Sequence, residues 1–284
     1  MASASSDARR DAHQSTAGVF LAHLRNPPVA PVLLVAAHPD DEVIGAGAHL
    51  TYWRDVSVVH VTDGAPRNHP YAPGTAFPDR AAYAAVRRRE AQDALAIAGI
   101  AVERIVELAF VDQEATFHLC EISKRIAALI AAIRPAVIVT QAYEGGHPDH
   151  DATCFAVHAA RRIVARSAVN PPGLVEMTAY FEYGRHRVTG SFLPSGETPV
   201  VIDLGGADRA RKRRMLLCHK SQGDLVEAFP LERECFRRAP DYDFRQPPHP
   251  GRLFYERHDF GLDGTRWREL ATTALRSLGD APSR

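Results

Sequence analysis

The segment AHPDDE (37–42) concentrates residues that bind metals and catalyse hydrolysis. It follows an apolar run, PVLLVAA (31–37), so three consecutive acids stand at the end of what the pattern predicts to be a buried strand. Neighbouring carboxylates repel one another in a low dielectric, and a bound cation would remove that penalty. A second segment, GHPDH (146–150), carries the same His-Pro-Asp pattern. The two segments together predict a divalent metal site.

The residue types of these two segments fit a catalytic zinc site. Zinc binds imidazole nitrogen and carboxylate oxygen, and catalytic sites combine three protein ligands with one open position. His38 and Asp41, at a predicted strand-to-helix turn, can face one ion, and His150 can complete the set from the second segment. Asp40 could then act as general base on an activated water. His147 is placed to donate to an oxyanion or to protonate a leaving group.

The elements that would position these residues alternate along the first part of the chain. Four short apolar runs suit strands of a parallel sheet covered on both faces; they lie at 31–37, 56–62, 104–110 and 136–142. Helical patterns are found at 43–53, about 80–98, about 118–133 and from about 150 onward. The alternation predicts an α/β fold: a Rossmann-like, doubly wound, mostly parallel sheet with helices on both faces. With the strand order 3-2-1-4, the segments after the first and fourth strands meet at the switch point, where such sheets bind ligands.

The pattern becomes less regular beyond residue 165. We interpret residues 29–284 as a single domain, with the core sheet in 31–165 and a C-terminal elaboration in 166–284. Residues 1–28, which are closed by NPP, are expected to be a flexible leader. The elaboration is expected to contain strands at 177–183 and 198–204, a helix over about 207–222 and a C-terminal helix.

Charge and composition exclude several classes of function. The 284 residues include 34 Lys and Arg and 34 Asp and Glu, so an even charge balance gives no electrostatic reason to expect nucleic acid as a partner. No apolar run approaches the roughly 20 residues of a membrane span. The four cysteines are widely spaced and are expected to be reduced, which favours a cytoplasmic protein. The sequence leaves open whether the chain forms a homo-oligomer.

Each acidic segment taken alone also has a purely structural interpretation. Asp40 or Asp41 could cap the following helix, with Glu42 complementing its dipole. Pro148 and Asp149 could begin the helix predicted near residue 150 in the same way. The metal site is favoured because both segments fall after strands whose ends are expected to meet.

Both segments resemble signatures of the PIG-L/LmbE-like family of zinc-dependent N-deacetylases. AHPDDE matches the first signature and GHPDH the second, without substitution. Weaker resemblances, with Ala98 and Met215 as departures from the family patterns, cover VTDG (61–64), RRREAQDALAIAG (87–99) and KRRMLLCHKSQ (212–222). The resemblance spans roughly residues 31–222 and implies a deacetylase domain of this type within 29–284.

The resemblance implies the same roles that the chemistry suggests. One Zn²⁺ per chain would be held by His38, Asp41 and His150, with Asp40 as the base and His147 as the acid or oxyanion partner. The implied activity removes an N-acetyl group from a small-molecule amino-sugar conjugate of the N-acetylglucosamine type. Two alternatives stay open: the same zinc site acting on another amide, such as a thiol conjugate or a longer N-acyl substrate, or a non-catalytic metal- or carbohydrate-binding relative.

Four further residues are candidates for substrate binding. Arg67 and Tyr71 lie in a Pro- and Gly-rich loop of lid-like length. Asp63 ends the second predicted strand. Arg87 could bind a substrate hydroxyl or phosphate, or could instead pair with Glu90 on an exposed helix face.

Overall fold

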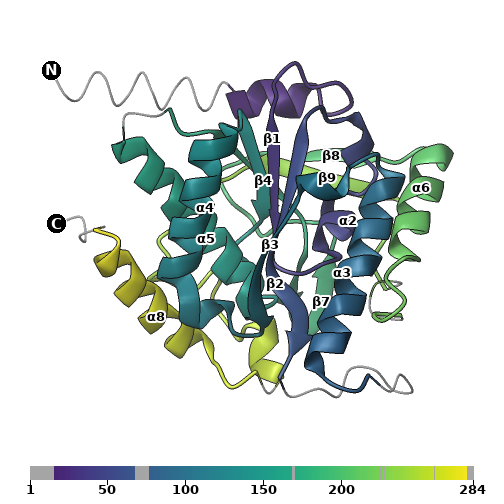
Figure 1. Cartoon of the computed structure of the whole chain (residues 1–284). Helices are drawn as coiled ribbons and strands as arrows, with labels where there is room; N and C mark the ends of the chain where they lie inside the picture. Colours follow the sequence, from purple (N-terminus) through teal and green to yellow (C-terminus); the bar gives the residue numbers. More distant parts are fainter. Residues whose placement is uncertain are drawn as a thin grey trace, which may run out of the picture.

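Strands and helices alternate along most of the chain (Figure 1). The structure, a computed structural model, describes residues 16–67, 77–167, 170–223, 226, 228–258 and 260–279. Its elements, with 3₁₀ helices labelled η, are in chain order β1 (Val32–Ala36), α2 (Asp41–Ala46), η1 (Leu50–Tyr52), β2 (Val56–Pro66), α3 (Arg80–Ile97), η2 (Val102–Arg104), β3 (Ile105–Asp112), η3 (Ala115–His118), α4 (Leu119–Ile133), β4 (Val137–Gln141), α5 (Pro148–Arg166), β5 (Gly173–Met177), β6 (Tyr180–Tyr183), β7 (His186–Thr189), β8 (Val200–Asp203), α6 (Gly206–Leu216), β9 (Arg233–Arg238), η4 (Phe254–Arg257) and α8 (Gly264–Ser277).

The central sheet has seven strands in the order β3-β2-β1-β4-β5-β9-β8. β1 to β5 run parallel, and at one edge β9 pairs antiparallel with β5 and β8 pairs antiparallel with β9. Val32 of β1 pairs with Val56 on one side and Val137 on the other, so these strands start in register. The predicted doubly wound α/β architecture and the order 3-2-1-4 are therefore confirmed. The switch point lies between the carboxyl ends of β1 and β4.

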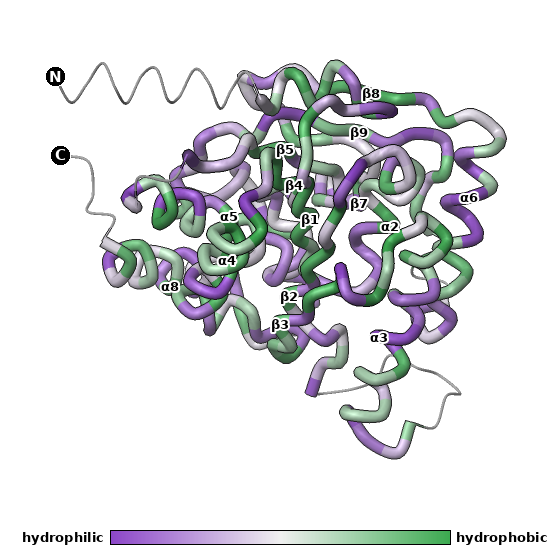
Figure 2. The backbone as a smooth tube through the Cα atoms, turned by 45° about the horizontal axis from the view of Figure 1, so that its top comes forward, coloured by the Kyte–Doolittle hydropathy of each residue, from purple (hydrophilic) through white to green (hydrophobic). Residues whose placement is uncertain are grey.

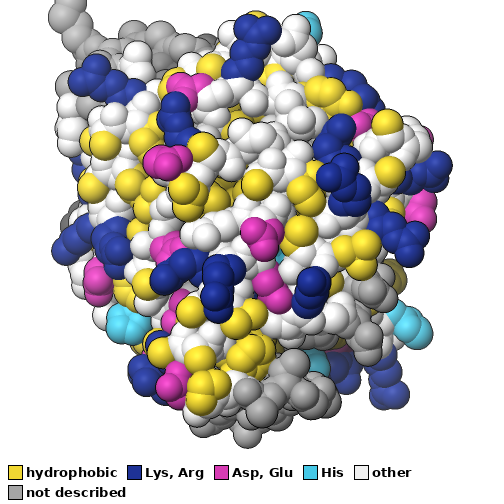
Figure 3. All heavy atoms as spheres, turned by 45° about the vertical axis from the view of Figure 1, so that its right-hand side comes forward, with side chains coloured by type: hydrophobic (Ala, Val, Ile, Leu, Met, Phe, Trp, Pro, Cys, Tyr) yellow, Lys and Arg dark blue, Asp and Glu magenta, His cyan; other side chains and the backbone are white. Residues whose placement is uncertain are grey.

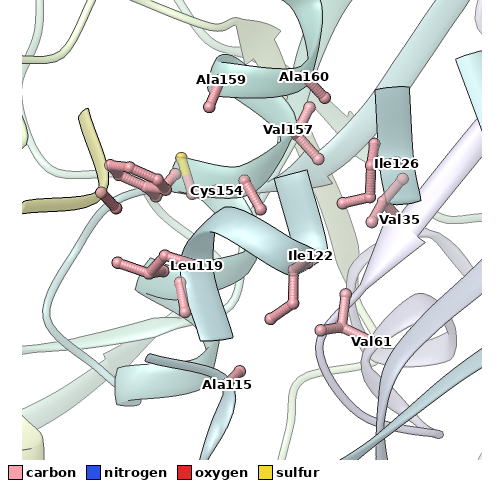
Figure 4. Packing of buried hydrophobic residues seen from close by; sticks show 14 of the residues in the cluster. Val35, Val61, Ala115, Leu119, Ile122, Ile126, Cys154, Val157, Ala159 and Ala160 are labelled. Atoms are coloured by element: carbon pink, nitrogen blue, oxygen red, sulfur yellow. The ribbon is translucent and has the colours of Figure 1, made fainter. Parts of the chain in front are cut away.

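The parallel strands are apolar on both faces because helices cover both sides (Figure 2). Leu33 and Val35 belong to the core cluster that includes side chains of α4, α5 and α8. Figure 4 shows part of this cluster, in which Ile126 of α4 lies beside Val35 and Ile122 lies on the side of Val61. Val32 and Leu34, which point to the other face, join the cluster with α2, α3 and α6. Each such buried side chain stabilises the fold by about 1.5–3 kcal/mol, which makes the sheet a rigid base for the site.

Two expected elements differ in detail. The strand expected at 177–183 is divided, because β5 ends in the central sheet at Met177 and β6 pairs with β7 in a separate two-stranded sheet. The backbone N–H of Thr178 still donates to the carbonyl of Cys235, and the chain then leaves the sheet. The helix expected at 43–53 is also shorter, since α2 ends at Ala46 and is followed by Gly47 and a 3₁₀ turn at Leu50–Tyr52.

The described part of the predicted leader packs against the core. Phe20 is fully buried with its ring centroid 5.1 Å from that of Trp53, and the Trp53 indole N–H donates to the carbonyl of Leu24 at 3.0 Å. The apolar residues recur at helical spacing, which gives residues 16–22 one buried stripe. The expectation of a flexible leader is wrong for residues 17–24, and residues 1–15 lie outside the described part of the chain.

The C-terminal part of the chain holds the site in place. It contributes β5, β9 and β8 to the sheet, and α8 packs beside α4 (Figure 1). The buried Trp267 of α8 donates its indole N–H to the carbonyl of Pro148 at 3.2 Å, at the start of α5. The Phe254 N–H donates to the Gly145 carbonyl at 2.9 Å. The loop that carries GHPDH is therefore fixed by residues more than a hundred positions away.

The surface and the helices agree with the balanced charge. On the face shown in Figure 3, basic side chains are interspersed with acidic and apolar ones. Within the described residues, no helix combines the length and the apolar character that crossing a bilayer requires.

A buried carboxyl after β4 predicts a pH dependence of stability. Burial raises the pKa of Glu144 from 4.5 to about 8, although the Leu193 N–H donates to this carboxyl at 3.0 Å. Between these values the folded chain holds a proton that the unfolded chain releases, so stability should fall as the pH rises through this window. We expect the melting temperature to fall less between about pH 5 and pH 8 in Glu144→Gln than in the wild type. Thermal unfolding at a series of pH values measures this difference. The exposed Glu103→Gln serves as control; an unchanged slope in Glu144→Gln would contradict the assignment.

Candidate metal centre and active site

The turn between β1 and α2 is held in a strained conformation at Asp40. Its φ of 148° lies outside the range that side chains favour, at a cost of about 1–3 kcal/mol. The Asp40 N–H donates to a carboxylate oxygen of Glu42 at 3.1 Å, and Glu42 in turn contacts His60 Nε2 at 3.0 Å. The Asp40 side chain makes no helix-capping hydrogen bond. The capping interpretation is therefore wrong for Asp40, whose carboxylate faces the pocket instead.

Arg87 holds the Asp40 carboxylate in place. The guanidinium is buried and donates to Asp40 Oδ2 at 3.0 Å, to the Pro39 carbonyl at 2.9 Å and to the Gly64 carbonyl at 2.7 Å. Gly64 is required there because a Cβ at this position would lie 2.7 Å from the guanidinium carbon. Because both terminal nitrogens of its guanidinium donate to the protein in this way, Arg87 lines the pocket chiefly as a positioning residue.

The carboxylate of Asp41 lies between two imidazoles from the two predicted segments. Its Oδ2 is 3.1 Å from Nδ1 of His38, and its Oδ1 is 3.2 Å from Nε2 of His150. The His38 N–H also donates to Asp41 Oδ2 at 2.8 Å, which fixes the carboxylate at the end of β1. All three side chains are buried. The three predicted ligands thus converge from both sides of the switch point.

The other nitrogen of His38 faces two acids whose contact with it the sequence analysis did not predict. Nε2 lies 3.1 Å from Asp112 and 3.3 Å from Asp149. Asp149 is itself held by the N–H groups of Gln113 and Ala115, at 2.6 and 3.1 Å. A carboxylate partner on one imidazole nitrogen orients the ring and leaves the other nitrogen free for a metal. Asp112 could have been found from the sequence, since it ends the third strand at the same edge of the sheet.

His147 presents a donor to the same space. Its Nδ1 accepts a hydrogen bond from the Asp149 N–H at 3.1 Å and so caps α5, whose first residue is Pro148 as the structural interpretation expected. Burial holds the pKa of His147 well below its usual value, so the ring is neutral. A neutral imidazole that accepts at Nδ1 carries its proton at Nε2. Nitrogen atoms of His38, His147 and His150 lie within 4.8 Å of one another, and this tautomer gives His147 an N–H donor at Nε2.

The pKa values of the two neighbouring aspartates are shifted in opposite directions. Burial raises the pKa of Asp40 to about 7, against the opposing effect of the Arg87 guanidinium. For Asp41, the nearby imidazoles of His150 and His38 outweigh burial and hold its pKa well below the usual range. A carboxylate with a pKa near neutrality suits a general base, and one that stays ionised suits a metal ligand.

Two of the other predicted substrate-binding residues, Arg67 and Asp63, lie apart from this cluster. Arg67 is exposed and forms an ion pair with Glu114 at 2.5 Å, and Asp63 pairs with Arg80; neither lines the pocket. Tyr71 lies outside the described residues. The proposed pairing of Arg87 with Glu90 is not formed, because Glu90 instead accepts from the N–H and hydroxyl of Ser221.

The fold and the site together define a class of α/β protein. Its members have a Rossmann-like sheet with a buried His/Asp cluster at the switch point. Residues 33–161 match the profile of the PIG-L family, described as GlcNAc-PI de-N-acetylase. Residues 33–161 are therefore similar to a PIG-L family domain, which confirms the resemblance drawn from AHPDDE and GHPDH. None of the curated proteins compared with the chain matches it.

Solved structures share the fold at low sequence identity. The zinc-inhibited form of teicoplanin deacetylase Orf2 is 21% identical, with a TM-score of 0.53, over 74% of this chain and 99% of that one. N,N'-diacetylchitobiose deacetylase from Pyrococcus horikoshii is 19% identical, with a TM-score of 0.56, over 83% and 92%. GalB, the 4-carboxy-2-hydroxymuconate hydratase of Pseudomonas putida KT2440, is 16% identical, with a TM-score of 0.51, over 75% and 97%. Because both deacetylases and a hydratase share this fold, the reaction must be argued from the site.

Proposed function

We propose that this protein is a metal-dependent hydrolase that removes the N-acetyl group from an amino-sugar conjugate of the N-acetylglucosamine type. The observation that carries the proposal is the placement of Asp40 and His147 beside the Asp41 carboxylate and its two imidazoles in one pocket. A binding protein would need only the ligands. A base and an oxyanion donor beside them favour hydrolysis. The PIG-L family match supports an amino sugar as the substrate.

The donor set fits a divalent metal such as zinc. His38, Asp41 and His150 offer two imidazole nitrogens and a carboxylate, which are ligand types of catalytic zinc sites. His38 is already oriented by Asp112 and Asp149. We propose one Zn²⁺ per chain at these three residues. When bound, the ion would supply Lewis-acid activation of water and of the amide carbonyl.

The residues of the chain would then divide the proton transfers between them. The Asp40 carboxylate takes a proton from the water that attacks the amide carbon. The Nε2–H of His147 donates to the carbonyl oxygen as negative charge develops there. When the C–N bond breaks, the proton held by Asp40 passes to the leaving nitrogen, and the products are a free amine and acetate. Arg87 keeps Asp40 aimed at the pocket throughout.

We propose that the protein works in the cytoplasm. All four cysteines (Cys120, Cys154, Cys218 and Cys235) are free thiols, which supports a reducing compartment such as the cytoplasm.

The direct test is product analysis with a small panel of amides. We expect the metal-loaded protein to release acetate and free amine in equal amounts from methyl N-acetyl-β-glucosaminide. Release of an acid longer than acetate would indicate that the same site acts on a longer N-acyl substrate. Release of an amine from a thiol conjugate alone would indicate that the site acts on that amide instead. Hydration of an unsaturated acid without cleavage of a C–N bond would favour a hydratase. No turnover of any substrate by metal-loaded protein would contradict the proposal.

A further inference from the structure

Six aromatic side chains form a closed circuit beside the site. We call them the aromatic collar; in order around the circuit they are His147, Phe260, His258, Phe254, Tyr180 and His150. Successive ring centroids lie 4.9, 5.6, 5.0, 5.4 and 5.3 Å apart, and 5.2 Å separates His150 from His147. Two collar members are therefore the donor and a ligand of the proposed reaction. Whatever the collar binds lies directly beside the reacting amide.

Two glycines of the sequence EGGHPDH allow the collar to pack closely against the metal-site loop. A Cβ on Gly146 would lie 1.9 Å from the carbonyl oxygen of Tyr180, and one on Gly145 would lie 2.7 Å from a methyl carbon of Leu253. Gly145 also has a φ of 70° and accepts the hydrogen bond from the Phe254 N–H. The absence of side chains at 145 and 146 thus allows both collar segments to pack directly on the metal-site loop.

The rings of the collar that are not histidines form an apolar part of the pocket wall, which also carries polar side chains. Tyr180, Phe254 and Phe260 line the pocket with half-buried rings. Phe229 extends this wall, with its ring centroid 6.0 Å from that of Tyr180, and the guanidinium of Arg187 lies 5.2 Å from the Phe229 ring. Asp40, Arg87, Asp112 and Gln113 face the same pocket. The polar groups suit sugar hydroxyls, and the rings suit a group that gains by leaving water.

The residues of this wall lie outside the part of the chain that matches the family profile. Tyr180, Phe229, Phe254 and Phe260 all follow residue 161, where the match ends. The family match therefore assigns no role to these four residues.

We propose that the aromatic collar is a subsite for an apolar group, about the size of a phenyl ring, that the amino-sugar substrate carries beside its scissile amide. This inference rests on the proposed function. Two sources share this chemistry: an apolar aglycone on the sugar, or an acyl group longer than acetyl. A free N-acetylated monosaccharide would fill only the polar side of the pocket.

Binding to a hydrolysis-impaired holoprotein tests the collar separately from the reaction. Calorimetric titration of metal-loaded Asp40→Asn would compare the phenyl and methyl β-glycosides of N-acetylglucosamine for the aglycone, and the N-benzoyl and N-acetyl methyl glycosides for the acyl group. We expect at least one apolar member of a pair to bind about tenfold more tightly than its partner, as burial of a ring would give. Which pair shows the gain identifies the source.

Collar variants show whether the gain arises where we place it. Phe260→Ala and Phe254→Leu, each combined with Asp40→Asn, should remove most of the preference while the methyl N-acetyl glycoside binds as before. Phe117→Ala is the matched control, since Phe117 is half exposed on η3 and does not line the pocket. Equal affinities within both pairs, or a preference that persists in the collar variants, would overturn the inference. A failure of the proposed function would instead appear as absent amine release from the wild-type holoprotein, whatever the binding preference.

Discussion

An Asp40→Asn substitution should lower turnover of an N-acetylated amino sugar by about 10²–10⁴-fold while the metal content stays unchanged. Asparagine keeps an oxygen that can accept from Arg87 and tolerates the positive φ of this position better than most residues. It cannot take a proton from water. The loss should therefore fall on turnover, with the melting temperature and metal stoichiometry close to those of the wild type.

The matched control for this variant is Asp63→Asn. Asp63 is also an aspartate at the end of a parallel strand, but it pairs with Arg80 and does not line the pocket. Its substitution should leave turnover within a few-fold of wild type. Activity kinetics and elemental analysis on the same preparations decide the outcome. Near-normal turnover in Asp40→Asn would remove Asp40 from the mechanism.

The second large effect concerns which side chains hold the metal. Asp41→Asn and His150→Ala should each lose both the ion and the activity, because each removes a proposed ligand from a three-ligand site. His147→Gln should keep the ion and lower turnover by about 10²–10³-fold, as expected for loss of an oxyanion donor. The different outcomes follow from the Nδ1 of His147, which accepts from the Asp149 N–H and leaves Nε2 protonated.

His158→Ala is the control for the effect of removing a buried imidazole from the same helix. His158 is buried on α5 but packs against Tyr242 and Phe244 in the core. His158→Ala should lower thermal stability and retain the metal. Metal content by elemental analysis separates the cases. Loss of the ion from His147→Gln, together with its retention in Asp41→Asn, would reverse our assignment of the third ligand.

The parts of this account that the sequence predicts share one physical basis. Continuous apolar runs such as PVLLVAA indicate buried parallel strands, and the order of such strands fixes where their carboxyl ends meet. Two His-Pro-Asp segments at those ends were therefore enough to bring His38, Asp41 and His150 together. Functional residues at the ends of parallel strands can be placed together from the sequence because the sheet is regular.

The parts that were missed depend on packing between distant segments. Arg87 was expected to bind substrate or to pair with Glu90, and no helical spacing shows that it reaches back to Asp40. The aromatic collar has no period in the sequence, since its rings come from β6, η4 and the N-terminus of α5. The amphipathic stripe of residues 17–24 was present in the sequence but was interpreted as part of a leader. Side-chain partners between segments are fixed by tertiary structure rather than by local pattern.

The central claim is that the two His-Pro-Asp segments form a metal-dependent amide-hydrolysing site. The most direct measurement is metal content of the purified chain together with amine release from methyl N-acetyl-β-glucosaminide, before chelation, after chelation and after zinc is restored. We predict about one ion per chain, loss of amine release on chelation, and recovery with zinc. Amine release that continues in metal-free protein, or a chain that binds no divalent metal after reconstitution, would contradict the account.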